Sequence, residues 1–327
     1  MFLGILAMVL VGCSWTFFGY VMGKAPKRNI DVAQLLFISS LMTIVVSLLI
    51  ACVQGCIFGF PQVSAFGWFM GIGVLIGSGL VNYFQLEFMS RAMQNGPNGI
   101  IWTITQSGFI LPFFMGILFF SVPLSLFRLL GFLAILVALV IMGFGKDNSA
   151  RGKWKLWVLI AFLGTGFSQV LSNLPSYYTE ADGVTSIWRT MSVAVGMALG
   201  ALLVKAKDLK NFFPVLKVHF CRKDVWAYCS ILLLFELVTS FFLLYYGMDL
   251  LVKNNAGSIA YPIMVSSCLI CFELFAIIAL RERRSLAQWL ALFLCLAGIV
   301  GICMQDQTTE KNGETQKVQS VEAAEKA

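Results

Sequence analysis

The chain has 327 residues, 59% of them hydrophobic and 12% charged, with a formal net charge of +7 and a mean hydropathy of +0.86. Soluble domains carry roughly 25% charged residues, so this composition excludes a soluble enzyme, a nucleic-acid-binding protein and a secreted disulfide scaffold. At about 20 apolar residues per membrane span, the chain can supply about ten spans. The excess of Lys and Arg then marks cytoplasmic loops.

The first apolar run, 2–23, has no Lys or Arg before Lys24 and so lacks the positive start of a cleavable signal peptide. Leu10-Val11-Gly12-Cys13 spells a lipoprotein cleavage box, but apolar sequence continues to Met22. The run also has a counterpart later in the chain, so we expect it to stay as a membrane helix.

Apolar runs separated by polar residues predict an all-α membrane protein with ten transmembrane helices. The runs are 2–23, 32–54, 66–90, 98–120, 124–144, 156–178, 184–204, 225–250, 256–280 and 285–304. The longest internal loop, 205–224, is basic and is expected to be amphipathic. The tail, 305–327, is polar and has too few apolar residues to fold, so we expect it to be disordered.

The two halves of the chain resemble each other. A shift of 152 residues places Val11-Gly12-Cys13-Ser14 on Leu163-Gly164-Thr165-Gly166, and a shift of 158 places Trp68 on Trp226. The sequence therefore predicts two five-helix repeats, 1–145 and 146–304. An odd number of spans per repeat inverts the second repeat in the membrane, and inverted repeats are typical of alternating-access transporters with a substrate site between the halves.

Basic residues indicate the orientation. The loops that follow odd-numbered helices hold most of the Lys and Arg, including Lys24, Lys27, Arg28 and the basic loop 205–224. The positive-inside rule then places both termini outside the cytoplasm, in a multi-pass protein of the cell (inner) membrane.

The segment 256–303 resembles the last two helices of the EamA-like repeat in the drug/metabolite transporter superfamily. It reads Ala256-Gly257-Ser258-Ile259-Ala260-Tyr261-Pro262, then Leu280-Arg281-Glu282-Arg283-Arg284, and ends with Leu296-Ala297-Gly298. The family has a proline in its fourth helix, a Gly-Glu-Arg-like turn and an Ala-Gly near the end of its fifth. Here Arg281 replaces the glycine of the turn.

The first half departs further from that pattern, because Val122-Pro123 stands where the acidic turn would be. The basic first loop, Lys24-Ala25-Pro26-Lys27-Arg28, resembles the sugar-uptake branch (rhamnose and glucose/ribose porters). The resemblance implies ten helices in two repeats, and transport of sugars, amino acids, drugs or other small metabolites.

Ionisable residues inside a span are costly and often functional. Glu236, near the middle of the eighth helix, is the candidate proton-coupling residue, and a structural acid hydrogen-bonded to another helix is the alternative. Glu273, in the ninth, could bind substrate or a cation, or pair with an arginine. Glu87 and Arg91, at i and i+4, predict an ion pair. For Arg189 we favour snorkelling to the interface over binding an anionic substrate.

Amides and aromatic rings complete the predicted substrate site, because amides bond hydroxyls in both directions and rings stack on apolar sugar faces. Hydrogen bonding between helices is the alternative role. Glycine pairs at 67/71, 73/77 and 196/200 have the spacing of close helix packing. The candidate substrate-binding residues are Trp15, Asn82, Gln85, Gln106, Gln169, Asn173 and Glu273.

These features predict a secondary active transporter of a small polar metabolite, favouring a sugar, coupled to a proton or cation. An exporter of amino acids, drugs or other metabolites is the alternative, and a passive channel or membrane sensor is a second one. No enzyme motif, metal site or cofactor is expected, because the only histidine, His219, lies in the basic loop and the cysteines sit in apolar runs. The expected partners are the lipid bilayer and a small-molecule substrate, and no nucleic acid is expected. The sequence does not decide between a monomer and a homodimer.

Overall fold

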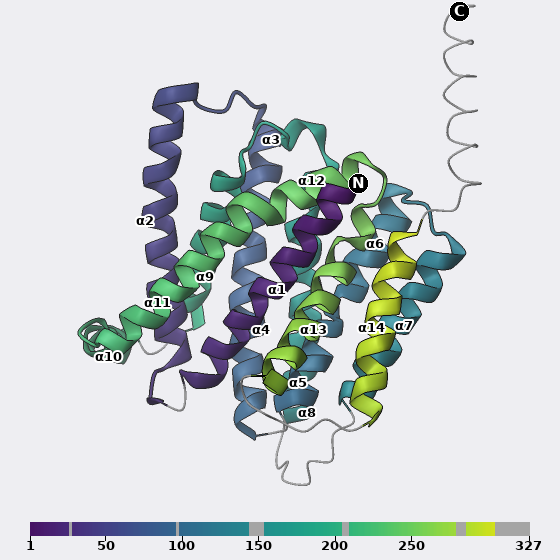
Figure 1. Cartoon of the computed structure of the whole chain (residues 1–327). Coiled ribbons are helices and arrows are strands. Elements are labelled where there is room, and N and C mark those ends of the chain that lie inside the picture. The colour runs from purple at the N-terminus through teal and green to yellow at the C-terminus, as the bar shows by residue number, and fades with distance from the viewer. Residues whose placement is uncertain (26–27, 96–97, 144–153, 205–208, 279–285, 305–327) are drawn as a thin grey trace, which may run out of the picture.

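We describe the chain from a computed structural model, which covers residues 1–25, 28–95, 98–143, 154–204, 209–278 and 286–304. Within these residues the chain is helical and contains no strand (Figure 1). The elements are α1 (Phe2–Lys24), α2 (Val32–Phe58), α3 (Ala65–Trp68), η2 (Phe69–Gly73), α4 (Val74–Asn95), α5 (Asn98–Gln106), η3 (Ser107–Phe109), α6 (Ile110–Phe120), α7 (Leu126–Gly143), α8 (Trp154–Asn173), η4 (Leu174–Tyr177), η5 (Thr179–Ala181), α9 (Ser186–Val204), α10 (Leu209–Phe220), α11 (Lys223–Glu236), η7 (Leu237–Leu244), α12 (Tyr245–Lys253), η8 (Gly257–Ile259), α13 (Ala260–Ile278) and α14 (Leu286–Cys303).

Among the described residues, five helical stretches are long and apolar enough to cross a membrane. They are Val32–Phe58, Ala65–Gln94, Trp154–Tyr177, Ser186–Val204 and Lys223–Lys253. Five shorter apolar stretches lie at Phe2–Phe18, Ile104–Phe120, Leu126–Ile141, Gly257–Cys271 and Trp289–Cys303, and each of the ten falls within or overlaps one predicted span. The protein is therefore an all-α membrane protein, and the predicted tail 305–327 lies outside the described residues.

The helices pack in pairs that join the two halves of the chain. Helix α1 packs against α13 and also against η7 and α12, while α8 packs against α4 and against α5, η3 and α6. Helix α2 contacts α11 and α9, α4 contacts α9, and α7 packs along α14. The bundle is thus built mainly from contacts between the halves rather than within them.

Four apolar clusters form the core of the described residues, and two of them are larger than the others. Met8, Phe113 and Met264 lie in the cluster that joins α1, α6 and α13. Phe37 and Tyr83 lie in the second, between α2, α4, α8 and α9. All three rings and both methionines are buried, so these residues serve packing.

Glycine permits the close approach of α4 to α9. A Cβ atom at Gly79 would overlap the carbonyl oxygen of Val193, and one at Gly196 would overlap that of Ile76. The predicted packing role is confirmed for Gly196, whereas Gly77 has nothing nearer to a Cβ than Leu171 Cδ1 at 3.9 Å.

Three helical stretches change type along their length. Helix α11 passes into the π-helix η7 directly after Glu236, and α5 passes into the 3₁₀-helix η3 directly after Gln106. The π-helical turn η2 joins α3 to α4. Such irregular turns within helices are frequent at functional sites, and two of these three adjoin the residues that the next section places at a cavity.

Candidate functional site

A cavity of about 180 Å³ lies between the two halves. A single buried water needs roughly 10–15 Å³, so the cavity has room for a small organic molecule. Its walls come from α1, α2, α4 and α5 of the first half and from α8, α9, α11, η7, α12 and α13 of the second. The lining residues are Ser14, Trp15, Phe18, Leu36, Ser39, Ser40, Ser78, Asn82, Gln85, Leu86, Met89, Trp102, Gln106, Thr165, Ser168, Gln169, Ser172, Thr190, Val193, Met197, Leu232, Phe235, Glu236, Thr239, Ser240, Leu244, Tyr245 and Tyr261.

The lining is polar but carries little charge. Hydroxyls and amides supply most of its polar groups, and Glu236 is the one carboxylic acid among these lining residues. None of the lining residues is Lys, Arg or His. An anionic ligand would find no countercharge here, so the chemistry of the walls favours a neutral or cationic ligand with hydrogen-bonding groups.

The structure brings most of the predicted site residues together. Trp15, Asn82, Gln85, Gln106, Gln169 and Glu236 all line the cavity. Asn173 does not: it is fully buried, and its Nδ2 donates to the carbonyl oxygen of Gly257 over 3.3 Å. The side chain of Glu273 lies outside the described part of the structure.

One amide pair already has protein partners. Gln85 Nε2 donates to Asn82 Oδ1 over 3.0 Å, and its Oε1 accepts from the hydroxyl of Thr165 over 2.8 Å. The Thr165 bond joins α4 to α8 across the two halves. These two bonds hold the side-chain amide of Gln85 in one orientation at the cavity wall.

Other amide and indole groups at the cavity have no partner among the described residues. Both side-chain polar atoms of Gln169 are buried and unpaired, as are Gln106 Oε1 and Trp102 Nε1. Most buried polar atoms in proteins are hydrogen-bonded. These groups offer donors and acceptors from both halves, and a ligand or ordered water in the cavity would satisfy them.

Glu236 lies at the junction of α11 and η7. The hydroxyl of Thr43 on α2 donates to its Oε2 over 3.1 Å. The acid is half-buried and lines the cavity, so it is accessible to a proton or a cationic group arriving there.

The snorkelling prediction for Arg189 is wrong. Its side chain is 1% exposed and donates to the carbonyl oxygens of Val184 and Ala181 and to the carboxylate of Asp249 at 2.9 Å. Local carbonyls and a partner 60 residues away satisfy the guanidinium within the protein, so it does not need to reach the interface. The predicted Glu87–Arg91 ion pair is confirmed at 2.9 Å.

Sequence reasoning missed the hydroxyls of the cavity and Trp102. Serine and threonine in a helix often bond the carbonyl four residues earlier, and Ser40 and Thr239 do so here at 2.8 and 2.6 Å. A serine or threonine in an apolar run therefore does not by itself indicate a binding site. The described residues contain no group of three or more His, Cys, Asp or Glu side chains that could hold a metal.

Neither a scan against models of protein families nor a search of curated proteins finds a match for this chain. Solved structures do match its fold. One, titled "Crystal structure of protein", superposes with a TM-score of 0.59 over 92% of this chain and 95% of its own, at 15% sequence identity. The likeness at this identity is one of fold, and it extends over nearly the whole bundle.

Proposed function

We propose that this protein is a secondary active transporter that moves a small polar metabolite by alternating access. The observation that carries the proposal is the cavity between the halves, lined by unpaired amides and an indole and containing one acid. In transporters with inverted repeats the substrate site lies between the repeats. Glu236 is the proposed site of proton or cation coupling.

The packing supports two inverted five-helix repeats. If the repeats are related by a pseudo-two-fold axis, each contact between the halves should occur twice, with the roles of the halves exchanged. The contact of α1 with α13 has its counterpart in α8 with α5, η3 and α6, and that of α1 with α12 in α8 with α4. The pairs α7 with α14 and α2 with α9 join equivalent helices, as contacts across the axis must.

The lack of a basic side chain at the cavity wall supports a neutral substrate. Trp15 and Trp102 provide ring faces beside amides and hydroxyls, which is the combination that recognises a sugar or similar polyhydroxy compound. Within this proposal, the motifs around Pro262 and Gly298 point to an EamA-like member of the drug/metabolite transporter superfamily.

We also propose an orientation in the cell membrane. The end of the bundle that carries α10 and the α1–α2 turn (Figure 1) holds the basic loop and would face the cytoplasm. Both termini would then lie on the opposite side.

The test has two stages. A thermal-shift screen of the purified protein against sugars, amino acids and nucleosides should find a stabilising ligand, because a compound that binds the folded state raises its stability. Proteoliposomes should then accumulate that ligand against its gradient, and an uncoupler should abolish accumulation. Equilibration without accumulation would indicate a passive channel, and binding without flux would indicate a sensor.

A further inference from the structure

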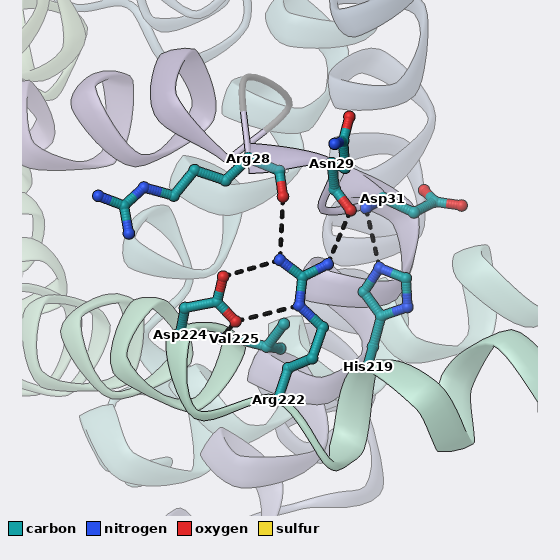
Figure 2. Close-up of polar contacts among 7 residues, drawn as sticks. All are labelled: Arg28, Asn29, Asp31, His219, Arg222, Asp224 and Val225. Atoms are coloured by element: carbon teal, nitrogen blue, oxygen red, sulfur yellow. Dashed lines mark hydrogen bonds and ion pairs between the residues drawn. The ribbon is translucent and has the colours of Figure 1, made fainter.

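A polar clasp ties the two halves together at the end of the bundle that carries α10. It joins the α1–α2 turn of the first half to the α10–α11 turn of the second (Figure 2). His219 and Arg222 supply its side chains, and residues 28–31 supply its backbone groups.

Arg222 provides the permanent part of this clasp. Its guanidinium donates to the carbonyl oxygens of Arg28 and Asn29, each over 2.9 Å, and to both carboxylate oxygens of Asp224 over 3.1 and 2.7 Å. The hydrogen bonds to Asp224 raise the pKa of the Arg222 guanidinium, which therefore stays charged. Its contacts do not depend on pH in the physiological range.

His219 provides the part whose hydrogen bonds require one protonation state of the side chain. Its Nε2 accepts a hydrogen bond from the backbone N–H of Asp31 over 3.1 Å, so this nitrogen carries no proton. Its Nδ1 lies 3.0 Å from the carbonyl oxygen of Val215 and is the protonated nitrogen that donates to it. The buried ring is thus held in one neutral tautomer by both of its nitrogens.

Protonation would remove this arrangement. A proton on Nε2 would point at the N–H of Asp31, leaving two donors facing each other and no acceptor. The Asp31 carboxylate does not take over, because it accepts from the N–H of Ala33 over 2.8 Å and points away from the ring in Figure 2. Protonation of the imidazole would therefore break this hydrogen bond.

The opposite end of the bundle lacks an equivalent clasp among the described residues. At that end the start of α3 packs against η5. In the proposed repeat, the start of α3 corresponds to the α10–α11 turn, and η5 corresponds to the α1–α2 turn. That junction consists of Gly67 against the carbonyl oxygen of Glu180 and of the Phe66 and Tyr178 rings, 5.6 Å apart. Neither contact involves a group that titrates near neutral pH.

We propose that His219 is a proton-sensitive latch that keeps the cavity closed at the α10 end and releases it when the imidazole is protonated. The inference rests on the proposed function, since access matters only if the cavity takes a ligand. The charged residues on the segments that form the clasp are Lys217, Arg222, Lys223 and Asp224 on one side and Arg28 and Asp31 on the other. Positive charges outnumber negative ones in this set, so a proton on His219 would add repulsion between the two turns.

The first test uses the unaltered protein. Hydrogen–deuterium exchange of the Asp31 amide, corrected for the intrinsic effect of pH, should be about five-fold faster at about pH 5.5 than at about pH 7.5, the effect of losing one hydrogen bond. In His219→Gln, which is neutral at both values, the corrected rate should not change with pH. An equal corrected rate at both pH values in the unaltered protein would overturn the latch.

The second test measures access to the cavity. A single cysteine at Ser39, in a background without the native cysteines, is labelled by an impermeant maleimide added from the side on which position 221 reacts. Labelling should be faster at the lower pH, and His219→Gln should remove that difference. The control Arg222→Gln should speed labelling at both pH values and keep the difference.

Labelling that ignores pH while the Asp31 amide responds would overturn the gating role of the clasp. Neither measurement requires a substrate or transport. A failed uptake assay would therefore count against the proposed function without affecting these results, and failed exchange and labelling tests would leave the transporter proposal standing.

Discussion

The hydroxyl of Thr43 donates a hydrogen bond to Glu236 Oε2 across 3.1 Å, which connects α2 of the first half to α11 of the second. The one acid among the described cavity-lining residues is thus held by a neutral donor rather than by a cation. A carboxyl with such a partner keeps its hydrogen bond in either protonation state, because the hydroxyl can donate to it or accept from it. This is a suitable environment for a group that must load and release a proton.

Replacing Glu236 by Gln should abolish uphill accumulation while preserving exchange of substrate across vesicles, because the amide mimics the protonated acid permanently. Exchange should also lose its pH dependence. The measurement is counterflow and uptake in proteoliposomes. Thr43→Val is the control: it removes the donor, keeps the acid and should retain accumulation. Normal accumulation in Glu236→Gln would end the coupling role and make Glu273 the next candidate.

The two amides of the α8 segment should behave differently. Gln169→Ala should weaken ligand binding about ten-fold, or about 1.4 kcal/mol, the scale of one or two hydrogen bonds, with little change in Tm. Asn173→Ala should leave affinity intact and lower stability by about 1 kcal/mol, because the buried carbonyl of Gly257 loses one of its two donors and keeps the N–H of Ala260. Calorimetric binding and thermal melts of both variants check this, and the reverse assignment would show that Asn173 faces the ligand.

Removal of the buried cation at Arg189 should be strongly destabilising. Arg189→Met removes the side-chain donor from the carbonyl oxygens of Val184 and Ala181, of which Ala181 keeps the N–H of Val184. It also leaves the 27% exposed Asp249 side chain without its cation, and breaking a buried pair costs about 3–5 kcal/mol. Lys253→Gln is the matched control, because its 3.8 Å pair with Asp182 is well exposed and exposed pairs contribute about 0–1 kcal/mol. Similar melting temperatures for the two variants would contradict the buried network.

Replacing glycine by alanine should affect stability differently at two of the glycines that the sequence assigns to close helix packing. Gly196→Ala should destabilise the protein by about 1–3 kcal/mol, since the added carbon must push α9 away from the backbone of α4. Gly77→Ala would place its Cβ 3.9 Å from Leu171 Cδ1, an ordinary contact distance, and should not lower Tm. Thermal unfolding in detergent measures both, and an unaffected Gly196→Ala would mean that the helices are not in close contact there.

Membrane orientation can be tested with single cysteines in a background without the native ones. A cysteine at Gln62, after α2, should react with an impermeant reagent added to intact cells, and one at position 221 should react only after permeabilisation. A reporter fused after Ala327 should behave as extracytoplasmic. Labelling of position 221 in intact cells would invert the proposed topology while leaving the fold unchanged.

The sequence alone determined the helical class and the approximate position of every apolar segment. A membrane span must be apolar over its own length, because nothing in the hydrocarbon region can hydrogen-bond its backbone, so the requirement is local and readable. Glu236, Gln106 and Gln169 could be found for the same reason, since each is a polar exception within such a segment.

The tertiary structure decided what those exceptions do. The same amide chemistry places Gln169 at the cavity and Asn173 against a backbone carbonyl one turn later, and only the neighbouring helices separate the two roles. The partners of Arg189 and Glu236 are 60 and 193 residues away in the chain, so their burial could not be derived from local sequence. The hydroxyls of the cavity could not be predicted from the sequence for a related reason. Each can bond a carbonyl of its own helix, and only the packing of helices from both halves determines which hydroxyls also face the cavity.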